Sequence, residues 1–309
     1  MMTGMQKIRY CALGAVLLLS VSSVSVLAAC GRRSFAAVTS ETATHPFAET
    51  ERETVQTEAA REKKNDERME EGNEGYRGFT LDDVLHSEEG DVHFNLYIPE
   101  SYDGNTPYAL YLTLPAYEGL YFQGVGINIQ SEDFAFEAQK YNEKMIIAAP
   151  QLEDWGEISA RKTVSLTEYL LDHYSIDRTK VYINGYSGGG ETLSMVLDMH
   201  PELYTAALMC SSRWDGGYDT VTAAKISVYF VIGDSDEYYS ADPFRKAYQE
   251  IRKRYEAEGL TEDEISKLVQ LDVKPESYFR AGGVNNQHGG GGMLFPRDES
   301  VMGWLFGEH

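Results

Sequence analysis

A serine between glycines is the clearest chemical signal in the sequence. Residues 185–189 read Gly-Tyr-Ser-Gly-Gly, and they lie between an apolar segment, residues 181–184, and an amphipathic one, residues 191–199. A sharp turn from a strand into a helix presents a serine hydroxyl group only where the flanking positions are too small to collide. The pattern predicts that Ser187 is a nucleophile. The alternatives are a simple tight turn or a phosphate-binding loop, and the latter lacks the lysine of nucleotide-binding loops.

A nucleophilic serine needs a base, normally a histidine that a carboxylate holds in place. Where the serine follows a strand in this way, the order along the chain is serine, acid, histidine. Five of the seven histidines precede the candidate acids and His309 is the last residue, which leaves His288. It lies in a glycine-rich segment, residues 282–292, which we expect to be a flexible polar loop.

Three carboxylates follow the apolar segment 227–232 closely enough to orient that histidine. They are Asp234, Asp236 and Glu237, and spacing alone does not choose among them. A metal site built from the same acids is disfavoured, because no nearby histidine or second acidic cluster completes a set of ligands. We therefore expect neither a metal nor a cofactor.

Short apolar segments alternate with helical patterns along the rest of the chain. The segments are apolar at successive positions, as in strands that are covered on both faces. They comprise residues 92–98, 108–114, 145–149, 181–184, 206–210 and 227–232. Between them, residues 159–174 repeat apolar side chains at helical spacing. This alternation predicts an α/β domain with a mostly parallel sheet and helices on both faces, in which the first one or two strands are free to be antiparallel.

Three motifs in order resemble those of the α/β-hydrolase superfamily: Gly-Tyr-Ser-Gly-Gly at 185–189, Gly-x-x-Asp at 233–236 and Asn-x-Gln-His-Gly at 285–289. From about residue 92 onward the chain is similar to the branch that holds prolyl oligopeptidase-like, esterase D-like and feruloyl-esterase-like enzymes. The resemblance implies an α/β-hydrolase fold. It also implies that the acid is Asp236 and not Asp234.

With those roles, Ser187 attacks an acyl carbonyl group, His288 takes up and returns the proton, and Asp236 holds the imidazole. The oxyanion requires two N–H donors. We expect one from Gly188, which follows the nucleophile, and the other from the loop after residues 108–114. In that loop we assign it to Tyr117, although the sequence does not separate Tyr117 from Ala116.

The expected activity is hydrolysis of a carboxylic ester through an acyl-enzyme. One alternative is a prolyl oligopeptidase-like peptidase that cleaves short peptides, although the chain has no room for the large propeller of the full-length enzymes. Another is a ligand-binding lipoprotein that kept the fold without the chemistry, and retention of all three triad residue types argues against it.

Three large side chains follow strand ends, at the edge where this fold places its site. Trp155 and Trp214 are each suited to stack on a sugar or an aromatic acyl group, and equally suited to pack in the protein. Arg213 is suited to hold a substrate carboxylate or to pair with Asp215.

The start of the chain is typical of an exported protein. Lys7 and Arg9 precede an apolar run that is short for a membrane span. Residues 27–31, Leu-Ala-Ala-Cys-Gly, resemble the lipobox of bacterial lipoproteins. We therefore predict a signal peptide over residues 1–29 and a lipid on Cys30 that anchors the protein to the outer face of the cytoplasmic membrane.

The next segment, residues 30–78, is polar with few large apolar side chains, and it predicts a disordered tether. The catalytic domain is then expected over residues 79–309. Cys210 is the one cysteine that remains in this domain, where it closes an apolar run, so we expect a buried thiol and no disulfide.

The charge balance limits the choice of partners. The chain has 27 lysines and arginines against 49 aspartates and glutamates, a net charge of −22. Such a surface repels nucleic acid and anionic lipid head groups. We therefore expect a small ester or a short peptide as the substrate, no nucleic-acid partner, and membrane contact only through the lipid on Cys30.

Overall fold

The computed structural model describes residues 67–307 and 309. The predicted signal peptide, Cys30 and most of the predicted tether lie outside the described residues. In the part of the chain that is described, no helix combines the length and the apolar character needed to cross a membrane.

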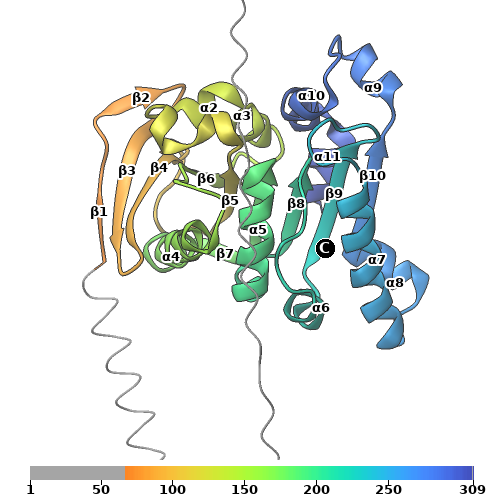
Figure 1. Ribbon diagram of the computed structural model, residues 1–309. Helices are drawn as coiled ribbons and strands as arrows, with labels where there is room; N and C mark the ends of the chain where they lie inside the picture. The colour runs from red at the N-terminus through yellow and green to blue at the C-terminus, as the bar shows by residue number, and fades with distance from the viewer. Residues whose placement is uncertain (1–66, 308) are drawn as a thin grey trace, which may run out of the picture. The chain divides into compact units, whose positions relative to one another are not determined.

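A mixed sheet of ten strands forms the centre of the domain (Figure 1). The strands are β1 (Arg68–Glu70), β2 (Glu74–Tyr76), β3 (Phe79–Ser87), β4 (Gly90–Tyr97), β5 (Tyr108–Leu114), β6 (Met145–Pro150), β7 (Ile176–Tyr186), β8 (Ala206–Cys210), β9 (Ser227–Gly233) and β10 (Val269–Lys274). Their order in the sheet is β1-β3-β4-β6-β5-β7-β8-β9-β10, and β2 pairs with β3. Neighbours from β6 to β10 are parallel, whereas β1 to β4 join in antiparallel pairs.

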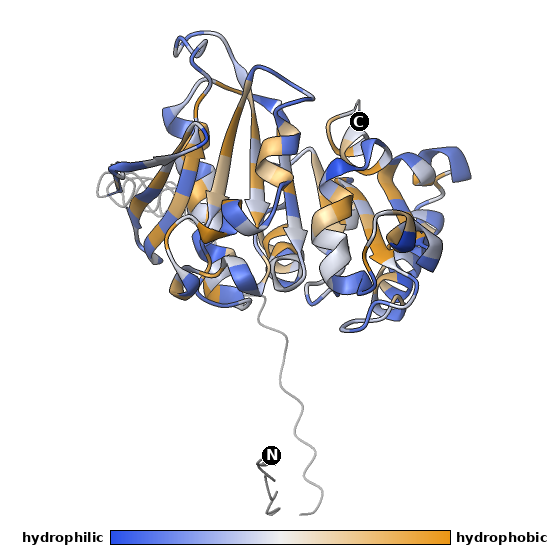
Figure 2. Cartoon of the chain, turned by 90° about the horizontal axis from the view of Figure 1, so that it is seen from above, coloured by the Kyte–Doolittle hydropathy of each residue, from blue (hydrophilic) through white to orange (hydrophobic). Residues whose placement is uncertain are grey.

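Helices cover both faces of this sheet. The α-helices are α2 (Ile127–Ser131), α3 (Phe134–Ala138), α4 (Glu157–His173), α5 (Gly188–Met199), α6 (Asp219–Ala224), α7 (Asp242–Ala257), α8 (Glu262–Leu268), α9 (Glu276–Ala281), α10 (Gln287–Leu294) and α11 (Glu299–Leu305). The 3₁₀ helices are η1 (Tyr117–Gly119), η2 (Tyr121–Gln123), η3 (Pro201–Leu203) and η4 (Phe295–Arg297). Seen from above, the apolar strands lie between helices whose outer faces are polar (Figure 2).

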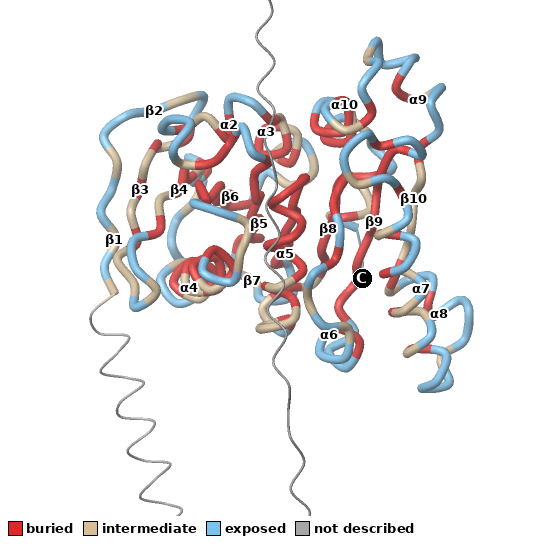
Figure 3. The backbone as a smooth tube through the Cα atoms, viewed as in Figure 1, coloured by how far each residue is buried: buried red, intermediate tan, exposed pale blue. Residues whose placement is uncertain are grey.

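Strand β8 shows how the two faces are filled. Its five residues are all buried, and they alternate between two hydrophobic clusters: Ala207 and Met209 belong to one, Leu208 and Cys210 to the other. The first cluster includes apolar side chains of α4 to α7, and the second includes those of α3, α9 and α11. Figure 3 shows the same pattern, with β8, β9 and α5 largely buried and β1, α8 and α9 largely exposed. The predicted α/β architecture is confirmed, including the buried thiol of Cys210.

The domain begins earlier than residue 79, which is a correction to the predicted tether. Residues 68–70 and 74–76 form β1 and β2, and both pair with β3. Asp83 on β3 also accepts the N–H of Gly72 at 2.8 Å. Backbone pairing holds these two short strands, and each packs a single half-buried side chain, Met69 or Tyr76, against the core. One apolar residue per strand gives no pattern that could be recognised in the sequence.

Candidate active site

Ser187 lies at the turn between the end of β7 and the start of α5. Its backbone has φ 55° and ψ −124°, a conformation that costs a non-glycine residue about 1–3 kcal/mol. Its N–H donates to the carbonyl oxygen of Cys210 on β8 at 2.9 Å. The strand and the helix approach so closely that a Cβ on Gly185 would lie 2.4 Å from the carbonyl oxygen of Gly189. Glycine at these positions is therefore a steric requirement of the turn.

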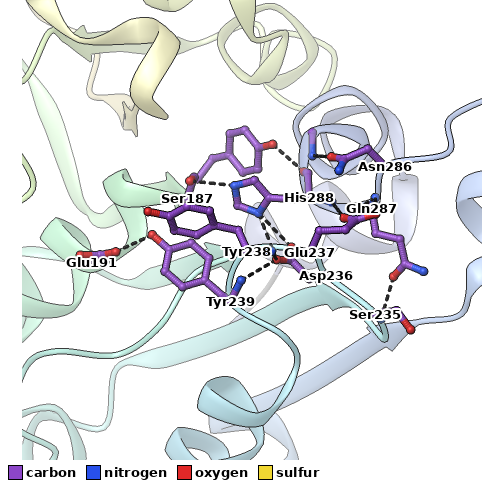
Figure 4. A network of polar contacts seen from close by, with 12 residues as sticks. Ser187, Glu191, Ser235, Asp236, Glu237, Tyr238, Tyr239, Asn286, Gln287 and His288 are labelled. Atoms are coloured by element: carbon purple, nitrogen blue, oxygen red, sulfur yellow. Dashed lines mark hydrogen bonds and ion pairs between the residues drawn. The ribbon is translucent and has the colours of Figure 1, made fainter. Parts of the chain in front are cut away.

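The structure brings Ser187, His288 and Asp236 together (Figure 4). The Ser187 Oγ lies 3.0 Å from His288 Nε2, and His288 Nδ1 lies 2.9 Å from Asp236 Oδ2. Because a carboxylate only accepts hydrogen bonds, Nδ1 carries the proton and Nε2 is left to accept from the serine hydroxyl group.

The Asp236 carboxyl group stays ionised although its side chain is fully buried. Burial alone would raise its pKa, but the hydrogen bond from His288 and the N–H groups of Tyr239 and Tyr238 lower that pKa below the ordinary value. These two N–H groups donate to Asp236 Oδ1 at 2.9 and 3.0 Å. The acid is thus held as an anion that can stabilise a positive imidazole.

The other two candidate acids have different surroundings. Asp234 is exposed and pairs with Arg245 at 3.3 Å. The Glu237 carboxylate accepts the backbone N–H groups of Gln287 and His288 at 2.8 and 2.9 Å. Of the three carboxylates that the spacing left open, only Asp236 contacts the imidazole ring through its side chain.

The glycine-rich segment is partly helical, which corrects the prediction of a flexible loop over residues 282–292. Residues 287–294 form α10, and the Asn286 side chain accepts the N–H of Gly289 at its start. Glycine is a poor helix former, but packing requires it here: a Cβ on Gly292 would lie 2.5 Å from the ring of Tyr186. The Tyr186 hydroxyl group donates to the carbonyl oxygen of His288 at 2.6 Å. The base therefore lies on a packed helix.

A pocket of about 490 Å³ opens at Ser187 and His288. Its aromatic lining residues are Tyr117, Trp155, Tyr186, Tyr238 and Tyr239. Its carboxyl groups belong to Glu118 and Glu132, and no lysine or arginine among the described residues lines it. The pocket therefore offers flat apolar surfaces and two carboxyl groups, without a lysine or arginine of the described residues to pair with them.

Only one of the three predicted substrate contacts reaches this pocket. The Trp155 indole lies directly over Gly188, where an added Cβ would be 2.3 Å from the ring. Trp214 is buried and donates its indole N–H to Gly217, away from the pocket. Arg213 pairs with Asp215 at 3.0 Å and with Glu191 at 3.1 Å. Of the alternatives that the sequence left open, Trp214 is packed in the protein and Arg213 pairs with Asp215, so neither lines this pocket.

The two expected oxyanion donors, the N–H groups of Gly188 and Tyr117, both belong to residues that line the pocket. Gly188 begins α5 and Tyr117 begins η1, and the first N–H of a helix has no partner within that helix. The Ala116 N–H already donates to Glu132 at 2.7 Å, which favours Tyr117 over Ala116. The two helix starts are adjacent, since a Cβ on Gly189 would lie 2.5 Å from the carbonyl oxygen of Leu114.

Several polar residues of the site escaped the sequence reasoning. Glu191, on the first turn of α5, accepts hydrogen bonds from Tyr239 and Arg213. Gln287 accepts the N–H of Ser235 at 2.8 Å through its side-chain oxygen. Glu132 belongs to no motif. Glu191 and Gln287 lie close in sequence to Ser187 and His288, which could have marked them as site residues. The sequence holds no comparable signal for Glu132.

Comparisons with known proteins agree with this geometry. Residues 151–255 match the family model described as the prolyl oligopeptidase family, a span that includes Ser187 and Asp236. No curated protein matches the sequence.

Solved structures share the fold at low sequence identity. A thermostable esterase is 18% identical with a TM-score of 0.59, over 74% of this chain and 62% of the esterase. FphF, a fluorophosphonate-binding serine hydrolase of Staphylococcus aureus, is 11% identical with a TM-score of 0.52, over 74% of this chain and 98% of FphF. A prolyl endopeptidase is 12% identical with a TM-score of 0.50, over 74% of this chain and 38% of that enzyme.

The chain thus spans about three fifths of the esterase and less than two fifths of the endopeptidase. At these identities the likeness shows the fold and not the substrate. The chain therefore has the α/β-hydrolase fold, a segment that matches the prolyl oligopeptidase family, and a serine, a histidine and an aspartate joined by hydrogen bonds in the arrangement that serine hydrolases use.

Proposed function

We propose that the protein is an exported, lipid-anchored serine esterase that uses Ser187, His288 and Asp236. The observation that carries the proposal is the continuous chain of hydrogen bonds from the Ser187 hydroxyl group to the buried Asp236 carboxylate, at the floor of an open pocket. The two N–H groups of Gly188 and Tyr117 complete the requirements for acyl transfer.

The reaction proceeds in two similar halves. Ser187 Oγ bonds to the ester carbonyl carbon as its proton moves to His288 Nε2, and the carbonyl oxygen becomes an oxyanion that the two N–H groups stabilise. The bond to the leaving oxygen then breaks, and Nε2 returns the proton to the departing alcohol. Water repeats the sequence on the acyl-enzyme and releases the carboxylic acid.

The pocket lining favours an ester with a small or aromatic acyl group. No lysine or arginine of the described chain lines the pocket, so no side chain there is suited to hold the carboxylate end of a short peptide. Trp155, Tyr117 and Tyr238 instead offer aromatic faces, and the latter two are strongly exposed. Such faces suit a sugar ring or an aromatic acid.

A peptidase is the second candidate, and one observation favours it. The segment from residue 151 to residue 255 matches the prolyl oligopeptidase family. A peptidase would use the same triad, with His288 returning the proton to a leaving amine.

Export and anchoring rest on the residues at the start of the chain. The lipobox-like segment that ends in Cys30 supports them. Cys30→Ser should release the protein from the membrane fraction of a bacterial host and abolish its labelling by a tagged fatty acid, and unchanged labelling would contradict the proposal.

The decisive experiment labels the protein with a fluorophosphonate probe and then measures turnover. Ser187 should be labelled and Ser187→Ala should not, while His288→Ala should stay folded and lose turnover. Equal labelling of the unmodified protein and of Ser187→Ala would overturn the triad.

A second experiment compares substrates. A panel of acetyl, feruloyl and longer-chain esters beside Xaa-Pro anilides should show at least a hundredfold preference in kcat/KM for one of the esters. A preference for the anilides would favour the peptidase.

A further inference from the structure

One buried carboxyl group beside the catalytic serine has no role in the mechanism above. Glu132 follows α2, is only 8% exposed, and lines the same pocket as Ser187. Burying a carboxyl group without a cation is costly, and none of the described lysines or arginines lines this pocket.

The contact of Glu132 points to what it does. Its Oε1 accepts the N–H of Ala116 at 2.7 Å. Ala116 is the residue before η1, so the next N–H along the chain is that of Tyr117. The other end of the turn is also fixed: the N–H of Gly119 donates to the Ala116 carbonyl oxygen at 3.0 Å, and a Cβ on Gly119 would lie 2.5 Å from Pro115.

We propose that Glu132 is a positioning residue, which holds the peptide before Tyr117 so that the Tyr117 N–H faces the oxyanion of the reaction. The inference rests on the proposed function, because it assigns a role in oxyanion stabilisation. It predicts that removing the acceptor at Glu132 weakens the transition state and leaves substrate binding nearly unchanged.

The surroundings of Glu132 also set the form in which it works. Burial raises its pKa to about 8, against the opposing hydrogen bond from Ala116. The titratable groups that face it are Glu118 on η1, Tyr111 on β5, Tyr186 on β7 and Cys210 on β8, with His288 on α10 across the pocket. None of them is a fixed cation, so nothing there offsets the effect of burial, and the raised pKa favours the protonated form of Glu132 at neutral pH.

Ionisation of Glu132 at alkaline pH would therefore oppose catalysis. It would put a negative charge beside the place where the oxyanion develops, in a pocket that contains no fixed cation to offset it. Because burial raises the pKa of Glu132 to about 8, its carboxyl group is mostly neutral below that pH and mostly charged above it. We expect kcat to fall as the pH rises through that range.

The test compares Glu132→Gln with Glu132→Ala in the full-length protein. Glutamine keeps an acceptor oxygen and cannot ionise, so kcat at pH 7 should stay within about threefold, and the fall in kcat above pH 8 should disappear. Alanine loses the acceptor, and kcat should fall about 10- to 100-fold, a fraction of the loss expected for a missing oxyanion donor, with KM nearly constant.

Glu143→Gln serves as the control, because it removes an exposed carboxylate that does not line the pocket at Ser187. It should change neither kcat nor the pH profile. An alkaline limb that survives in Glu132→Gln, or a folded Glu132→Ala with full kcat, would overturn the inference while fluorophosphonate labelling of Ser187 persists. Loss of labelling in the unmodified protein would instead reject the proposed function itself.

Discussion

Backbone packing shapes the turn that carries Ser187, whereas long-range side-chain contacts hold the helix that carries His288. In the nucleophile turn, residues 185–190, the backbone of the strand and that of the helix are in direct contact. In the acid–base junction, residues 233–239 with 286–292, side chains bridge two segments about fifty residues apart (Figure 4).

The junction contains three such bridges. Asp236 binds the ring of His288, Glu237 accepts the backbone N–H groups of Gln287 and His288, and the Gln287 side chain accepts the N–H of Ser235. The nucleophile turn should therefore lose stability and activity when a substitution adds atoms to it. The acid–base junction should lose them when a substitution removes polar atoms.

The largest effect is expected from Asp236→Asn. An amide holds the imidazole in the wrong tautomer and stabilises no positive charge, so kcat should fall about 10⁴-fold. Steady-state turnover at pH 7 measures the loss of activity, and a thermal melt checks that the variant is still folded.

Asp234→Asn is the control for that change, because the Asp234 side chain is exposed and its ion pair with Arg245 lies at the surface. Exposed pairs contribute about 0–1 kcal/mol, so kcat and the melting temperature should hardly move. A larger loss of activity in Asp234→Asn than in Asp236→Asn would reassign the acid.

The same contrast explains how much the sequence could predict. The nucleophile turn is local, since strand β7, the turn and helix α5 follow one another between residues 176 and 199. Elsewhere in the sheet, the predicted strands 108–114 and 206–210 coincide with β5 and β8. These segments are apolar throughout because both sheet faces are covered. Their apolar residues alone are therefore enough to predict these strands from the sequence.

The parts that the sequence missed depend on partners that are distant along the chain. β10 alternates apolar and polar residues at the sheet edge and directly follows α8, without turn residues to mark its start. α10 is rich in glycine and forms because it packs on Tyr186 and is capped by Asn286. Glu132 accepts a hydrogen bond from Ala116, which is 16 residues earlier in the chain, and no sequence motif links the two.

The next largest effect is expected at the nucleophile turn, from Gly185→Ala. The new Cβ would lie 2.4 Å from a backbone oxygen that cannot rotate away. Overpacking of this kind costs about 1–3 kcal/mol in unfolding free energy, and displacement of Ser187 should also reduce kcat. Chemical denaturation measures the first quantity.

Gly75→Ala on β2 is the matched control, because its Cβ would meet only one oxygen, at 3.5 Å. It should leave both the unfolding free energy and kcat nearly unchanged. Equal destabilisation by the two substitutions would mean that close backbone packing is not what distinguishes the nucleophile turn.

The smallest effect is expected from Glu237→Ala, at the acid–base junction. The substitution removes the acceptor for two N–H groups at the start of α10, comparable to the loss of a helix cap, so the unfolding free energy should fall by about 1 kcal/mol. A less fixed His288 should also lower kcat, by several-fold. Glu237→Gln keeps an acceptor oxygen and should lose less of both.

The difference in unfolding free energy between the unmodified protein and Glu237→Ala should depend on pH if Glu237 acts as an anion. Burial would raise the pKa of Glu237, but the N–H groups of His288 and Gln287 lower that pKa in the folded protein. Its contribution to stability is therefore complete above the unfolded pKa of about 4.3, and it is lost as the pH falls through the lower folded value. The gap in unfolding free energy between the unmodified protein and Glu237→Ala should be constant from pH 6 to 8 and close on acidification. A gap that widens in acid would show that Glu237 supports the junction by packing rather than as an anion that binds two N–H groups.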